Sequence, residues 1–291
     1  MPATSPRGRT PAKIRFGKSR EAKDQEIAVS RALTLPHDLG MDAALVAAAW
    51  QALVSLGAGH PGRPAMTAAL FFAVWSIYLG DRLWDSWRKD PAAPRAERHR
   101  LAQRHCLLFG HLAAGSFLLA SIFAFSALPT VTPLTGVALC FVAVLCAGYY
   151  FARAGFPEWE RGRAVVVGGI FAAGTLLAVP GLTGSLLFWL ILSLGALFTA
   201  NVRICVWSEA RLDGRILPLS LFPPLLLSIP GFAVAAMNGH WPAAIAGMMS
   251  IAGLGVLFFK RRNLDPEALA IQADALLFAP PLLMLAFWFV V

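Results

Sequence analysis

Long apolar runs repeat along the chain from residue 43 to its end, and they constrain the fold more than any other feature of the sequence. About 20 consecutive apolar residues cross a bilayer as a helix. Of the 291 residues, 57% are hydrophobic and only 14% are charged, whereas soluble domains carry about 25% charged residues. This composition excludes a water-soluble enzyme and a disordered protein. The sequence therefore predicts an all-α, polytopic membrane helical bundle.

Breaks at Gly, Pro and charged clusters divide the apolar runs into about nine predicted transmembrane helices. We place them at residues 43–58, 65–82, 107–127, 132–151, 164–181, 186–207, 216–237, 241–259 and 274–291. Residues 1–40 are polar and basic, which predicts a disordered tail with a short interfacial segment at Ile27–Leu35. Residues 41–291 then form the transmembrane domain.

The basic residues are distributed unequally between the two ends of these helices. With nine crossings, 24 of the 25 Lys and Arg residues fall on one side, and Arg63 falls on the other. Retained positive charge marks the cytoplasmic face, so the amino terminus is predicted to be cytoplasmic. Basic loops in such a protein indicate orientation and contact with anionic membrane lipids, and we expect no nucleic-acid partner. The acidic residues gather on the same side, which suggests that this end is the working surface.

Two pairs of carboxylates stand at the predicted cytoplasmic helix ends. Asp81 and Asp85 occur in YLGDRLWDSW, and Glu209 and Asp213 occur in WSEARLDGR. The i, i+4 spacing puts both acids of a pair on one helical face, roughly 5–6 Å apart at Cβ. Like charges so placed repel unless a cation lies between them, and Mg²⁺ is a hard cation that suits oxygen ligands.

The two pairs share one spacing, because each acid of the second pair follows its counterpart by 128 residues. An internal repeat of four helices explains this offset and would bring the pairs opposite each other at one depth. The alternative is that each pair forms ion pairs with nearby arginines in the headgroup region. Ionisable groups at membrane depth are costly and tend to be functional, so we favour the metal site.

Nine helices with acidic motifs at the ends of the second and sixth resemble the UbiA-type intramembrane prenyltransferases. Members of that family carry N-D-x-x-D-x-x-x-D and D-x-x-x-D, which bind Mg²⁺ on a prenyl diphosphate. Asp81 and Asp85 match the last two acids of the first motif, while Ile77 and Tyr78 replace its Asn and first Asp. Glu209 and Asp213 match the second motif, with Glu in place of its first Asp.

The resemblance also implies residues that bind the substrate. The family has a Tyr at the end of helix four, which Tyr149 or Tyr150 would supply, and a Lys before helix five, where this chain has Arg163. Arg can clasp diphosphate oxygens with two parallel hydrogen bonds. The other interpretation of Arg163 is an ordinary positive-inside residue.

Three further residues are candidates for substrate binding. Asn201 shares a helical face with Glu209 and Asp213 and could be a deeper polar ligand, or a satisfied core residue. Arg203 either provides a counter-charge for an anionic site or extends to the interface. Tyr78 belongs to an aromatic group that is typical of a membrane interface but could also steady a carbocation.

Together these features predict Mg²⁺-dependent transfer of a prenyl group from an isoprenoid diphosphate to a hydrophobic acceptor, such as an aromatic, quinone or lipid precursor. Asp81, Asp85, Glu209 and Asp213 would be the catalytic metal ligands. The predicted location is a bacterial inner membrane, with the active site on the cytoplasmic side. The alternatives are an isoprenoid cyclase without transferase activity, and a non-enzymatic membrane transporter or scaffold.

Overall fold

Every element in the described part of the chain is an α-helix. The computed structural model describes residues 36–60, 63–88, 97–127, 145, 148, 160–177, 179–182, 184–212 and 220–290. The described residues belong to one compact unit, Pro36–Val291. Its start therefore lies five residues before the predicted start of the transmembrane domain at residue 41. The predicted tail and interfacial segment lie outside the described residues.

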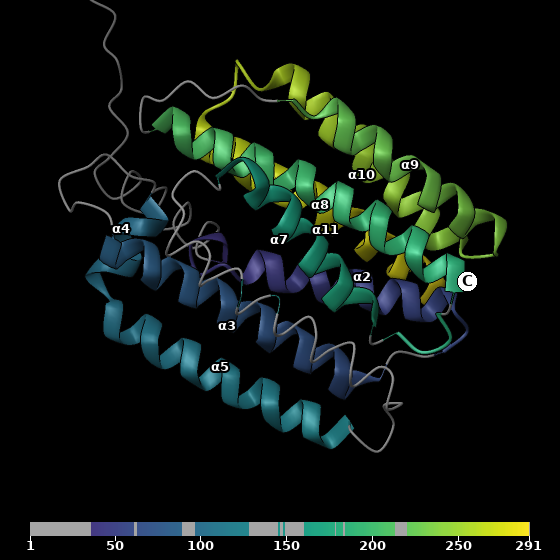
Figure 1. Cartoon of the computed structure of the whole chain (residues 1–291), viewed down its shortest axis with the longest axis horizontal. Coiled ribbons are helices and arrows are strands. Elements are labelled where there is room, and N and C mark those ends of the chain that lie inside the picture. Colours follow the sequence, from purple (N-terminus) through teal and green to yellow (C-terminus); the bar gives the residue numbers. More distant parts are fainter. Residues whose placement is uncertain are drawn as a thin grey trace, which may run out of the picture. The chain divides into compact units, whose positions relative to one another are not determined.

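The described helices lie on the predicted apolar runs (Figure 1), together with one short polar helix, Glu97–Arg104, that was not predicted. They are α2 (Met41–Gly57), α3 (Pro64–Arg88), α4 (Glu97–Arg104), α5 (Cys106–Ala127), α7 (Glu160–Leu177), α8 (Gly184–Leu212), α9 (Phe222–Met237), α10 (Trp241–Lys260) and α11 (Pro266–Val290). Five of these, namely α3, α5, α8, α10 and α11, are long and apolar enough to cross a membrane, while α2, α7 and α9 are shorter apolar helices. The predicted crossing at 132–151 lies outside the described residues, so the count of nine stays a prediction.

Helix α2 packs against α3, α7, α10 and α11, so it lies among helices from both halves of the chain (Figure 1). Helices α3 and α5 form one close pair, and α7 and α8 form another. The second pair is close because Gly168 has no side chain: a Cβ there would lie 2.6 Å from the carbonyl oxygen of Gly195. This packing brings the predicted cytoplasmic ends of α3, α7 and α8 toward the start of α2.

The outer faces of the bundle are apolar. On α5, Leu107 is 76% exposed, Phe117 66% and Phe125 71%, and α11 exposes Phe289 in the same way. Apolar surface of this extent is unusual on a soluble monomer and marks contact with a partner or a lipid. The exposed faces and the long apolar helices together indicate an integral membrane protein.

A hydrogen bond across the core ties α2 to α11. Pro281 lies inside α11 and has no N–H, so the carbonyl of Leu277 loses its partner in the helix. The indole Nε1 of Trp50, a fully buried residue of α2, donates to that carbonyl at 3.0 Å. In the absence of water, an unmatched carbonyl at this depth is costly. Trp50 therefore fixes α2 against the proline-containing turn of α11.

This arrangement predicts an interaction between two substitutions. Trp50→Phe keeps an aromatic ring but removes the donor, and we expect a loss of about 1–3 kcal/mol in the free energy of unfolding because the Leu277 carbonyl is left unmatched. Pro281→Ala restores an N–H within α11 that can pair with the Leu277 carbonyl. In a protein that carries Pro281→Ala, Trp50→Phe should therefore lower the free energy of unfolding by less. Denaturant titration of the four proteins in mixed micelles measures this coupling, and equal costs in both backgrounds would contradict it.

Candidate functional site

Asp81 and Arg163, two of the predicted site residues, lie close to each other in the structure. Asp81 is near the carboxyl end of α3 and Arg163 is in the first turn of α7, yet Arg163 Nη2 lies 3.4 Å from Asp81 Oδ2. The residues are 82 positions apart in the sequence. Asp85, one helical turn after Asp81, is buried together with Arg82. Charged groups from α3 and α7 therefore converge at this end of the bundle.

The second predicted acid pair is described only in part. Glu209 is a partly buried residue in the last turn of α8, whereas Asp213, Tyr149 and Tyr150 lie outside the described residues. Arg203 donates through Nη1 to the carbonyl of Ser220 at 2.9 Å. The convergence of all four predicted carboxylates therefore stays a prediction.

A different set of side chains forms a compact polar group, which we call the His37 cluster. It consists of His37, Asp42 and Asp274, whose ligand atoms all lie within 4.8 Å of one another. His37 Nδ1 is 2.5 Å from Asp42 Oδ2 and 3.3 Å from Asp274 Oδ2. Within the described ranges, this is the group of three such side chains that is close enough to hold a metal ion.

Gly40 makes the contact between His37 and Asp42 possible. Gly40 precedes α2 with φ 68°, a left-handed conformation that glycine adopts without a steric penalty. The chain turns there, because Gly40 N also donates to His37 O at 3.0 Å, and His37 folds back over the first turn of α2. A Cβ at position 40 would lie 3.2 Å from the Cβ of Tyr78. The sequence at this turn thus brings His37 onto Asp42.

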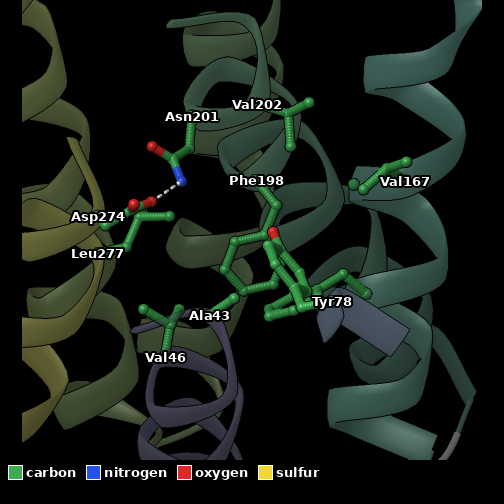
Figure 2. Close-up of a pocket in the computed structure, with 11 residues that line it drawn as sticks. Ala43, Val46, Tyr78, Val167, Phe198, Asn201, Val202, Asp274 and Leu277 are labelled. Atoms are coloured by element: carbon green, nitrogen blue, oxygen red, sulfur yellow. Dashed lines mark hydrogen bonds between the residues drawn. The ribbon is translucent and has the colours of Figure 1, made fainter. Parts of the chain in front are cut away.

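Asp274 reaches the cluster from α11. This helix begins at Pro266, so Asp274 lies two turns inside it and not at its end. On α8, Asn201 Nδ2 donates to Asp274 Oδ1 at 2.8 Å, as Figure 2 shows. The hydrogen bond joins residues that are 73 positions apart. The cluster and its neighbour therefore connect α2, α8 and α11.

A small cavity of about 20 Å³ borders the cluster. Its polar wall consists of Tyr78, Asn201 and Asp274, and Phe198 is part of its apolar lining (Figure 2). Phe171 also lines it. A cavity needs about 10–15 Å³ to admit one water molecule, and such a water needs two or more polar partners. This one is large enough and polar enough to hold a single water or ion.

The electrostatics of His37 follow from its two acidic neighbours. Burial alone lowers its pKa, but hydrogen bonds and charge attraction from Asp274 and Asp42 outweigh burial and raise the pKa from 6.5 to about 9. The imidazole is therefore protonated at neutral pH in the metal-free protein. It compensates part of the negative charge that the two carboxyl groups bring into the bundle.

The raised pKa predicts a pH dependence of stability. The stabilisation of the folded state by protonated His37 is complete below pH 6.5, and it disappears as the pH rises through about 9. We expect the wild-type protein, unfolded in detergent with a chelator present, to lose on the order of 3 kcal/mol across that window. The variant His37→Gln should lack most of this change, and His111→Gln, which alters an exposed histidine of α5, should keep it. If the free energy of unfolding changed with pH in the same way in the wild type and in His37→Gln, the raised pKa of His37 would be contradicted.

The sequence contained one signal for this cluster that the predicted boundaries missed. Asp265-Pro266-Glu267 has the features of a helix start, an N-cap acid followed by Pro and a further acid. Asp265 Oδ2 does accept from the backbone N–H of Glu267 at 3.0 Å. With the helix beginning there, Asp274 becomes an ionisable residue inside an apolar helix, which is a functional signal.

No protein-family model, no curated protein sequence and no solved structure matches this chain. The geometry of the two polar groups is therefore the basis for assigning a function.

Proposed function

We propose that the chain is a membrane-embedded transferase that moves an isoprenoid group from its diphosphate to a hydrophobic acceptor in a Mg²⁺-dependent reaction. The observation that supports this most is the contact between Arg163 and Asp81. A cation and an acid that the sequence assigned to one diphosphate site come from different helices and lie side by side. The nine-helix topology with a cytoplasmic amino terminus, and a cytoplasmic site in a bacterial inner membrane, belong to the same proposal.

The residues at the end of α3 suit a magnesium ion bound with phosphate. Mg²⁺ is usually held by one or two carboxylates together with substrate phosphates, so it does not need a closed cage of protein ligands. Asp81 and Asp85, one turn apart, would provide the first carboxylates, and Glu209 and Asp213 would provide the second pair. When bound, the ion would neutralise the diphosphate and stabilise it as a leaving group.

Arg163 would bind and orient the diphosphate. The side chains of Arg163 and Asp81 are 27% and 26% exposed, so an incoming anion can reach both. The planar guanidinium can donate two parallel hydrogen bonds to phosphate oxygens. The Asp81 partner holds the guanidinium in place before substrate arrives.

The apolar interior would protect the reactive allylic centre from water. Tyr78, one turn before Asp81 and Arg82 on α3, lines the small cavity with Phe171 and Phe198. Aromatic faces attract cations, and this attraction grows where water is excluded. Asn201 presents an amide at the same cavity. An electron-rich acceptor would attack the allylic carbon as the C–O bond to the diphosphate breaks. The proton lost from the acceptor would pass to the released diphosphate or to water, so no strong protein base is needed.

This proposal predicts that Arg163→Ala and Asp81→Asn each lower turnover by about 10²–10³-fold, because each removes stabilisation of the leaving diphosphate. The assay measures diphosphate release from allylic isoprenoid diphosphates of several chain lengths, in proteoliposomes supplied with extracted membrane lipids and quinones. Chelation by EDTA should abolish release, and added Mg²⁺ should restore it.

The matched control is Arg262→Ala, which removes an exposed basic residue after α10 on the same predicted side. It should retain wild-type turnover. Metal-independent release, or equal rates for Arg163→Ala and Arg262→Ala, would refute the mechanism. Conversion of the diphosphate to a cyclic product without an acceptor would instead indicate a cyclase, and the absence of diphosphate release with every donor and acceptor would favour a transporter or scaffold.

A further inference from the structure

We propose that His37, Asp42 and Asp274 bind a divalent transition-metal cation at a site separate from the predicted magnesium site. The three side chains come from the segment before α2, the first turn of α2 and the third turn of α11. None of them belongs to the acidic motifs at the ends of α3 and α8. The inference does not depend on the proposed transferase activity.

The ligand types favour a transition metal over magnesium. Imidazole nitrogen suits Zn²⁺ and other first-row transition metals, whereas Mg²⁺ prefers an all-oxygen shell. Two carboxylates with a neutral imidazole carry two negative charges, which a divalent cation balances without any other group. A buried site of this kind avoids the cost of an uncompensated charge.

The distances are close to those that such an ion requires. Four ligands at about 2.0–2.1 Å in a tetrahedral arrangement lie roughly 3.3 Å from one another. His37 Nδ1 and Asp274 Oδ2 are already 3.3 Å apart. His37 Nδ1 and Asp42 Oδ2 are 2.5 Å apart and would separate by roughly 0.8 Å as the ion replaces their hydrogen bond.

The surroundings provide an open coordination position and an outer shell. Zinc sites that keep an exchangeable position have three protein ligands and one water. The cavity of about 20 Å³ beside Asp274 has room for that water. Asn201 Nδ2 donates to Asp274 Oδ1, as outer-shell residues do to metal-bound carboxylates. The Oδ1 atom of Asn201 is buried and has no hydrogen-bond partner, so it can accept from a water in this cavity.

The three side chains of the site are mostly buried but keep some contact with solvent. The side chains of His37, Asp42 and Asp274 are 11%, 20% and 17% exposed. An ion can therefore enter without unfolding of the bundle, and once bound it is largely removed from water. The bound ion would link the start of α2 to α11 directly.

Metal content of the full-length, tag-free protein in detergent tests the proposal. The protein is stripped with a chelator, incubated with Zn²⁺ or Mn²⁺, separated from free metal and analysed by mass spectrometry. We expect about one ion per chain. Affinity should fall at least tenfold in His37→Gln and Asp274→Asn, and by about 10–100-fold in Asn201→Ala, which loses the outer-shell donor.

Two controls use the same residue types outside the cluster. Asp265→Asn alters the acid that caps α11, and His111→Gln alters an exposed histidine of α5; both should bind metal like the wild type. Asp81→Asn should also retain the ion, and this result separates the site from the predicted magnesium site. Failure of the transferase assay with intact metal binding would reject only the proposed function.

A second measurement uses the wild-type protein, so it does not require any variant to fold. Co²⁺ added to the stripped wild-type protein should give the intense visible absorption of a low-symmetry four- or five-coordinate site, and Zn²⁺ should displace it. Uptake of less than about a tenth of an ion per chain would overturn the proposal, as would a weak octahedral Co²⁺ spectrum. Unchanged uptake in folded His37→Gln and Asp274→Asn proteins would also overturn it, because the ion would then be bound elsewhere.

Discussion

The hydrogen bond from Trp50 to the Leu277 carbonyl joins the two helices whose polar residues meet at one end of this bundle. Pro281 removes the N–H that would otherwise satisfy Leu277, and α2 provides a donor from 227 positions away in the sequence. Because the apolar interior offers no water as a substitute, this bond holds α2 against α11. Asp42 lies about two turns before Trp50, and Asp274 lies one turn before Leu277. The interface that this bond stabilises therefore also contains the two carboxyl groups of the His37 cluster.

Two groups of charged residues then occupy one end of the described bundle, and Tyr78 lies between them. On one side are Asp81 and Arg163, from α3 and α7, with the exposure that a soluble anion would need. On the other is the His37 cluster, which is more deeply enclosed and contains a nitrogen ligand. The difference in burial and ligand type suits different partners, a phosphate-bound hard cation in the first case and a more tightly held transition metal in the second.

Much of the helical architecture could be predicted from the sequence, because an apolar run of membrane length has few alternatives to a helix. The sequence assigned Arg163 and Asp81 to one diphosphate site through a family resemblance, and that assignment stays a proposal. The His37 cluster was not predicted from the sequence, for two physical reasons. The start of α11 was placed at residue 274, so Asp274 was assigned to a helix end, where an acid is ordinary. In addition, contacts between residues 37 and 274 depend on how helices pack, and helix periodicity contains no information about that.

Leu39 determines how firmly the His37 cluster is held. The short segment that carries His37 joins α2 at Gly40, a residue in a left-handed conformation. Trp75 Nε1 donates to Leu39 O at 3.0 Å, and the Leu39 side chain packs against the apolar cluster of Leu79, Leu83, Ala102 and Phe109. A rotation of the Gly40 backbone that moved the imidazole away from both carboxyl groups would therefore also disturb the seat of Leu39. The polar cluster is anchored by an apolar neighbour as well as by its own hydrogen bonds.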